Sequence, residues 1–139
     1  MKDIDEIDEK IISILKANAR TPLSRISKEV GISKTAVKKR IDRLAREGII
    51  SRFTIELSSK VEVRALVLIR STAKGKTSET SEIIARFPFV EKVYEVAGDY
   101  DIVAMISSPT VEKLNETIDK IREVPSVTST ITVMVLKTY

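Results

Sequence analysis

The stretch that decides the fold is residues 30–48, VGISKTAVKKRIDRLAREG. Gly31 suits the end of one helix, because glycine tolerates the left-handed conformation, and Ser33 is a favourable N-cap for the next helix. Apolar residues then recur at steps of four and three, which is one face of a helix: Val37, Ile41 and Leu44. The stretch therefore predicts the turn and third helix of a helix-turn-helix unit, closed by Gly48.

Two further helices are predicted before this stretch, and a strand after it. The first helix has one apolar face and acidic residues in its first turns, where the helix dipole favours them; the face consists of Ile4, Ile7, Ile11, Ile12 and Leu15. Thr21 and Pro22 offer the N-cap and first position of a short second helix. Residues 49–57 change to a period of two, which predicts a strand, either a wing or the connection to the next domain.

The outward face of the third helix is strongly basic. From Arg20 to Arg52 there are ten Lys and Arg residues against three Asp and Glu, a net charge of +7. Such a concentration attracts a polyanion, although a solvated helix face is the plainer alternative. The capped third helix after a tight turn favours double-stranded DNA. The expected phosphate contacts are Lys34, Lys38, Lys39, Arg40, Arg43 and Arg46, and the expected base contacts are Ser33, Thr35 and Lys39.

The second half alternates strands and helices. Strands are expected at 63–69, 90–97, 102–106 and 127–136, helices at 78–87 and from 110 onward, and a turn at 74–76. The order βαββαβ predicts a ferredoxin-like fold, and FPFV at 87–90 echoes VPSV at 124–127. Expected inward residues are Ile83, Ile84 and Phe87 in the first helix, and Val111, Leu114, Ile118 and Ile121 in the second. The α+β chain thus divides into domains 1–57 and 58–139.

This fold leaves one sheet face without helices. Residues 65–69 and 133–136 are nevertheless apolar on both faces. We expect a second copy to cover the open face, which would present two recognition helices to two DNA half-sites. Coverage by the N-terminal domain is the alternative.

The loop Gly98-Asp99-Tyr100-Asp101 is the main candidate for a small-molecule site. Its residue types favour a hairpin turn over a ligand loop. The two acids also admit a Mg²⁺ enzyme, but no further ligand or base accompanies them.

Composition excludes several function classes. With no Cys and no His among 139 residues, disulfides, thiolate sites and histidine triads are ruled out. We expect no catalytic residue, no metal site and no cofactor. No long apolar run or leader indicates a membrane or secreted protein, so a cytoplasmic location is expected. The absence of Cys, His, Trp and Gln favours a thermophilic or archaeal source.

Together these features resemble the Lrp/AsnC (feast/famine) family of transcriptional regulators. The resemblance rests on residues 4–20, residues 26–46, Gly48-Ile49-Ile50 and the Gly98–Asp101 loop. It implies a winged helix-turn-helix followed by a ferredoxin-like effector domain, called RAM, in dimers that often assemble into octamers. The link from Phe53 to Val61 departs from the family pattern, because it is short and has no clear second wing strand.

The resemblance also changes the interpretation of the loop. It implies that a free amino acid binds in the second domain and modulates sequence-specific DNA binding. The implied effector residues are Gly98, Asp99, Tyr100, Asp101, Asn115, Asp119, Thr130 and Thr132. A sequence-indifferent architectural DNA-binding protein is the alternative function.

Overall fold

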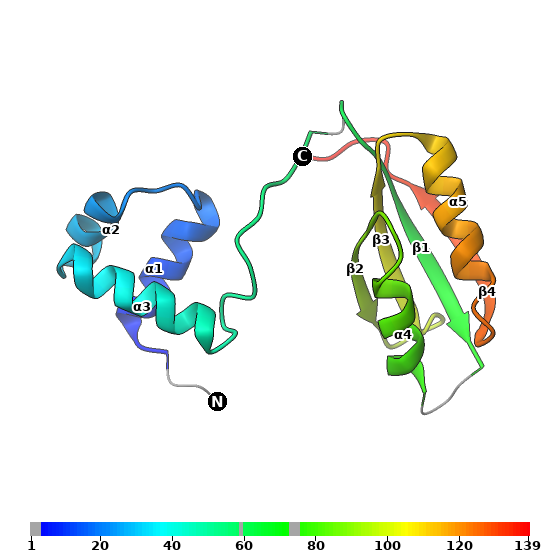
Figure 1. Cartoon of the computed structure of the whole chain (residues 1–139), viewed down its shortest axis with the longest axis horizontal. Helices are drawn as coiled ribbons and strands as arrows, with labels where there is room; N and C mark the ends of the chain where they lie inside the picture. The colour runs from blue at the N-terminus through cyan, green and yellow to red at the C-terminus, as the bar shows by residue number, and fades with distance from the viewer. Residues whose placement is uncertain (1–3, 59, 73–75) are drawn as a thin grey trace. The chain divides into compact units, whose positions relative to one another are not determined.

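A computed structural model describes residues 4–58, 60–72 and 76–139 of the chain. It forms two compact units, Met1–Ile55 and Glu56–Tyr139 (Figure 1). The first is a helical unit that contains the helix-turn-helix, and the second is a ferredoxin-like sheet with two helices. None of the described helices is long and apolar enough to cross a bilayer.

The first unit consists of α1 (Glu6–Ala17), α2 (Leu23–Val30) and α3 (Lys34–Arg46). Ile11, Ile26 and Val37 are fully buried, one from each helix, so the apolar faces of all three helices meet in one core. Partly buried residues that pack on this core are Ile7, Ile14, Leu15, Leu23, Val30, Ile32 and Ile41. The predicted three-helix arrangement is confirmed.

Two local predictions in this unit are wrong. Pro22, not Thr21, is the N-cap of α2, and the Thr21 hydroxyl donates to the Asn18 carbonyl at 2.7 Å instead. Ile4 precedes α1 and is 40% exposed, so it does not belong to the inner face.

The strand predicted at 49–57 is absent from the described residues. Residues 51–58 form neither helix nor strand, and Phe53, Ile55 and Leu57 are exposed. A strand requires a hydrogen-bonded neighbour, and no described segment of this chain pairs with residues 51–58. The first unit therefore has no wing strand in the described residues.

The second unit confirms the βαββαβ order. Its elements are β1 (Val63–Ser71), α4 (Thr77–Ala85), β2 (Val90–Glu95), β3 (Ile102–Ser108), α5 (Val111–Arg122) and β4 (Val127–Met134). The strands form one antiparallel sheet in the order β2-β3-β1-β4. Both α4 and α5 cover the same face of this sheet (Figure 1). Of the predicted turn at 74–76, only Lys76 belongs to the described residues.

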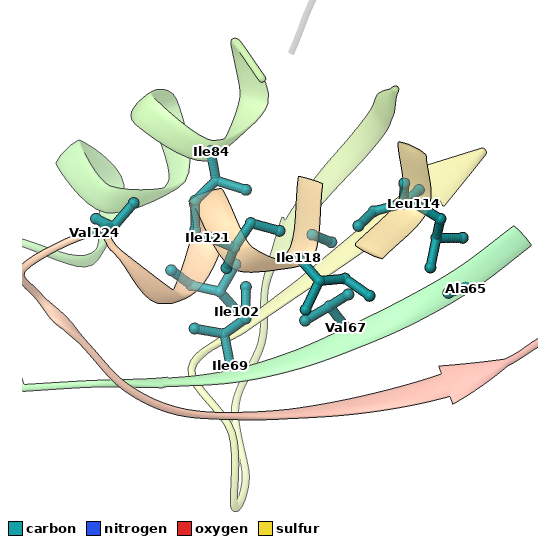
Figure 2. Packing of buried hydrophobic residues seen from close by; sticks show 11 residues of the cluster. Ala65, Val67, Ile69, Ile84, Ile102, Leu114, Ile118, Ile121 and Val124 are labelled. Carbon is teal, nitrogen blue, oxygen red and sulfur yellow. The ribbon is translucent and has the colours of Figure 1, made fainter. Parts of the chain in front are cut away.

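The core of the second unit lies between this sheet face and the helices. Figure 2 shows Ile118 and Ile121 of α5 packed above Val67 and Ile102 of the strands. Other buried members are Ala65, Ile69, Ile84, Ala104, Ile106, Leu114 and Val124.

The predicted inward positions of Ile83 and Val111 are wrong, since these side chains are 45% and 52% exposed. Thr80 and Thr117 are buried on the two helices instead. Their hydroxyls have hydrogen-bond partners, the Ser126 hydroxyl at 2.6 Å for Thr80 and the Lys113 carbonyl at 3.0 Å for Thr117. A satisfied hydroxyl can occupy the interior at little cost.

Candidate nucleic-acid interface and ligand site

A tight turn positions α3. Gly31 takes the left-handed conformation (φ 75°), and its N–H donates to the Ser27 carbonyl at 2.9 Å. The Ser27 hydroxyl donates across the turn to the Ile32 carbonyl at 2.5 Å. Ser33 caps α3 by accepting from the Ala36 N–H at 3.1 Å, as predicted. These contacts fix the residue at which α3 starts and the direction of α3 relative to α2.

The core determines which face of α3 is free. Val37 and Leu44 are fully buried, and Ile41 is partly buried. Six of the eight predicted DNA-contacting residues lie exposed on the remaining surface: Ser33, Lys34, Thr35, Lys38, Lys39 and Arg46. Lys38 forms an exposed ion pair with Asp42 at 3.0 Å, which contributes little to stability. The exposed surface of α3 therefore carries cations and hydroxyls, the kinds of group with which proteins contact phosphates and base edges.

The other two predicted residues, Arg40 and Arg43, are partly buried in an ion-pair cluster. Arg40 Nη1 lies 2.6 Å from Asp5 Oδ2 and 2.9 Å from Asp8 Oδ1, and Arg43 Nη2 lies 2.5 Å from Asp8 Oδ2. Their carboxylate partners, Asp5 for Arg40 and Asp8 for Arg43, raise the pKa of each guanidinium by hydrogen bonding. The cluster joins the start of α1 to the middle of α3.

Asp8 is the central acid of this cluster and is 1% exposed. Burial by itself would raise the pKa of Asp8, but hydrogen bonds from Arg43, Arg40 and the Asp5 N–H outweigh burial and lower it to about 2. Asp5 and Asp8 also form a reciprocal capping box at the start of α1. The cap was not predicted, although the Asp-x-x-Asp spacing is a local signal for it, and no local pattern indicated the arginine partners.

The loop at 98–101 is held against β1. Gly98 has a φ of 142°, which favours glycine. The Asp101 N–H donates to the Ile69 carbonyl at 3.0 Å, and the Asp101 carboxylate accepts from the Ser71 N–H at 2.7 Å. The Asp99 side chain is exposed.

Sequence reasoning missed Arg70, which holds the same loop. Its Nε donates to the Asp99 carbonyl at 2.9 Å, and its guanidinium lies 5.2 Å from the centre of the Tyr100 ring. An Arg at the end of an apolar strand was the available signal.

A second group of predicted effector residues lies around α5 and β4. Arg122, which sequence reasoning also missed, donates from Nε to the Thr130 hydroxyl at 3.1 Å and pairs through Nη1 with Asp119 Oδ1 at 3.2 Å. The Thr132 hydroxyl oxygen is buried and has no hydrogen-bond partner among the described residues. Asn115 is exposed on α5, and no described contact joins it to this group.

Sheet pairing brings Thr130 and the loop to the same end of β1. Ile69 pairs with Thr130 of β4 on one side and with Ile102, directly after the loop, on the other. The described residues contain no group of three or more Asp and Glu side chains arranged to hold a metal ion. The polar side chains gathered here form hydrogen bonds and ion pairs.

The sheet face away from α4 and α5 is apolar, and no described helix of the second unit covers it, so we call it the open sheet face. Strand register places these residues on it: Leu66, Leu68, Tyr94, Val103, Met105, Ile131 and Val133. Tyr94, Ile131 and Val133 are 45–50% exposed, and the others are partly exposed. The expected patch is present, and apolar patches of this kind mark interaction surfaces.

Comparisons with known proteins cover both units. Residues 4–45 match the family model of the AsnC-type helix-turn-helix domain, and residues 64–139 match that of the Lrp/AsnC ligand binding domain. The chain is 47% identical over 137 residues to the HTH-type transcriptional regulator LysM of Saccharolobus solfataricus, covering 99% of this chain and 96% of the relative. It is 38% identical over 139 residues to the HTH-type transcriptional regulator FL11 of Pyrococcus horikoshii, covering 98% and 91%. The solved structure of E. coli AsnC matches with a TM-score of 0.74 at 25% identity, covering 98% and 94%.

Proposed function

The chain belongs to the Lrp/AsnC family of helix-turn-helix transcriptional regulators, and on that premise we propose that it recognises specific DNA sequences under the control of a free amino acid. The observation that carries the proposal is the capped helix α3, whose apolar face is buried and whose cationic face is exposed. Relatives in this family are transcriptional regulators rather than enzymes.

In the proposed complex, α3 enters the major groove with its N-terminal end. Lys34, Lys38, Lys39, Arg40, Arg43 and Arg46 supply phosphate contacts, and Ser33, Thr35 and Lys39 read base edges. Lys39 is exposed and lies beside Arg40 and Arg43 in one surface hollow. We infer that the chain acts on genomic DNA in the cytoplasm.

We place the amino-acid effector near the loop at 98–101. Backbone groups of Gly98 and Asp99, with the Asp99 carboxylate, suit the charged main-chain groups of an amino acid. The group Asp119, Thr130 and Thr132 would contact the rest of the effector, with Asn115 further along α5. The buried Thr132 hydroxyl has no partner among the described residues, which supports this placement, because an unsatisfied buried polar group is stabilised by a ligand partner.

A homodimer is proposed from the open sheet face. Leu68 and Ile131 are directly opposite one another in register on this face, and stacking against a second copy would bury them. The dimer then presents two copies of α3 to DNA, and further association gives the octamer. Analytical ultracentrifugation of the purified chain tests this step, and a monomer at micromolar concentration would contradict it.

Selection from a random library of DNA duplexes tests the DNA function. A specific regulator enriches a common motif and binds it at least about 10³-fold more tightly than random duplex. An architectural protein enriches none, and absence of binding at low salt overturns both alternatives. Lys39→Ala should weaken binding and flatten the salt dependence by about one charge if the contact is to phosphate. Lys120→Ala, an exposed lysine of the second unit, is the matched control.

A thermal-shift screen with the twenty amino acids tests the effector. A ligand that binds only the native state stabilises it by RT ln(1 + [L]/Kd), so the unfolding temperature rises with the concentration of the ligand. Asp99→Asn should abolish the shift without unfolding the protein, since the Asp99 side chain is exposed. No shift with any amino acid would contradict the proposed effector class.

A further inference from the structure

A surface hollow in the first unit gathers three cations. Lys39, Arg40 and Arg43 line it together with Asp5. Like charges repel one another, so three such side chains would spread apart in water unless something held them. Long, flexible cations also lose conformational entropy when they are fixed on a ligand.

Asp8 supplies the restraint from inside the unit. Its two carboxylate oxygens contact different arginines, Oδ1 with Arg40 at 2.9 Å and Oδ2 with Arg43 at 2.5 Å. Because Asp8 is 1% exposed and lies in the capped first turn of α1, its position is set by the fold. The two guanidinium groups are therefore held by a rigid acceptor.

The arginines keep donors for another anion. Among the described contacts, Arg40 uses only Nη1 and Arg43 only Nη2 of their side chains, and a guanidinium carries five N–H donors. The two side chains are 28% and 31% exposed, so part of each guanidinium reaches solvent. Three cations against Asp5 and Asp8 leave the cluster with a net charge of +1.

We propose that Asp8 is a positioning residue for DNA binding, which holds Arg40 and Arg43 so that their remaining N–H donors, with Lys39, form a preorganised seat for one backbone phosphate. This inference rests on the proposed DNA-binding function. The group that binds in the hollow is a phosphodiester oxygen of the DNA backbone. Guanidinium donors in a fixed fork suit this group well.

If Asp8 positions the two arginines, removing its negative charge should weaken DNA binding, which is the opposite of what charge alone predicts. Removing a negative charge near DNA should tighten binding if charge alone matters. Asp8→Asn also removes a negative charge, but its amide N–H₂ would face one guanidinium, donor against donor. At least one arginine would then leave its position, and binding should weaken.

The experiment compares Asp8→Asn with Asp42→Asn, which removes the same charge from the exposed face of α3. The full chain is titrated onto a random-sequence duplex of about 30 base pairs at several salt concentrations, which reports phosphate contacts without base readout. Folding is verified by circular dichroism at the assay temperature. Asp42→Asn should tighten binding up to about twofold, the Coulomb effect of one charge about 10 Å away in water.

For Asp8→Asn we expect about fivefold weaker binding and a salt dependence flatter by one to two charges. In an Arg40→Gln/Arg43→Gln background the same substitution should have no further effect, because Asp8 acts through these arginines. Unchanged or tighter binding by Asp8→Asn would overturn the proposal. Failure of the wild-type chain to bind duplex would instead overturn the DNA-binding function itself.

Should Asp8→Asn not fold, Arg43→Lys tests the guanidinium fork that Asp8 is proposed to hold. Lys keeps the positive charge, but it lacks the planar guanidinium fork that lets Arg43 contact the buried Asp8 and a phosphate at the same time. We expect weaker binding and a flatter salt dependence for Arg43→Lys, and unchanged binding for Arg25→Lys, an exposed arginine on α2. Equal binding by the two variants would overturn the proposal.

Discussion

Protonation of Asp8 should selectively destabilise the helix-turn-helix unit in acid. The pKa of Asp8 is lowered from 3.8 to about 2, because the hydrogen bonds from Arg43, Arg40 and the Asp5 N–H outweigh the effect of burial. A carboxyl whose pKa is lower in the folded state contributes stability above its unfolded pKa and loses it as the pH falls through the folded pKa. The contribution is therefore complete above about pH 5 and disappears toward pH 2.

The size of this contribution to the unfolding free energy follows from the lowered pKa of Asp8. Each pKa unit corresponds to about 1.4 kcal/mol, so lowering the pKa from 3.8 to about 2 corresponds to about 2 kcal/mol of unfolding free energy. Solvent screens these interactions of the Asp8 carboxylate only weakly, because Asp8 is 1% exposed. Asp5, whose pKa is lowered chiefly by the hydrogen bond from the Asp8 N–H, shifts in the same direction.

The assay is urea unfolding of the wild type and Asp8→Asn between pH 6 and pH 2.5. Methyl NMR signals of Ile11 and Val37 report the first unit separately, because both side chains are buried in its core. The stability advantage of the wild type over Asp8→Asn should shrink by about 1.5 kcal/mol between pH 6 and pH 2.5, because the Asn side chain does not titrate. A difference that does not change with pH, or a carboxyl carbon signal of Asp8 that titrates near pH 3.8, would refute the reasoning.

Four further substitutions test other contacts. Ser33→Ala removes the N-cap of α3 and should lower the unfolding free energy by about 1 kcal/mol in urea titrations, whereas Ser33→Asp should not. Thr132→Val removes a buried hydroxyl that has no partner in the part of the chain the structure describes; without effector it should be neutral or stabilising by up to about 1 kcal/mol in thermal unfolding, and clear destabilisation would contradict this. Arg70→Ala should speed hydrogen exchange in the loop at 98–101 and reduce effector-induced stabilisation; unchanged exchange would show that the loop needs no such anchor. Ile131→Asp places a charge on the open sheet face and should shift sedimentation toward the monomer, whereas an unchanged dimer would mean another surface associates.

Much of the helical unit could be predicted because its signals are local. Gly31 and Ser33 mark the turn and the start of α3, and apolar spacing identified the buried positions Val37 and Leu44. The free face of α3 follows directly from its buried face, since the helical period leaves little choice. The burial of Thr80 in place of Ile83 was not predicted, because a threonine enters a core only when a particular partner satisfies its hydroxyl, here Ser126.

The prediction of a strand at 49–57 was wrong for a related reason, because a strand also depends on a partner elsewhere in the protein. Alternation indicates which side chains share a face, but a strand also needs a neighbouring backbone. Exposed Phe53 and Ile55 keep the alternating pattern without a partner among the described residues. The pattern is thus a property of the segment, whereas pairing is a property of the assembled protein.

From the residues themselves came the two-unit order, the cationic face of α3 and the candidate loop at 98–101, because helix caps, apolar periods and turn residues act over a few positions. The fold alone decided that Asp8 meets Arg40 and Arg43, which are 32 and 35 residues away, and that Arg70 and Arg122 lie against predicted effector residues. Such contacts depend on how helices and strands pack after they form. An ion pair between distant residues produces no periodic pattern in the sequence. Its partners can be identified only in the folded structure, where packing brings the opposite charges close together.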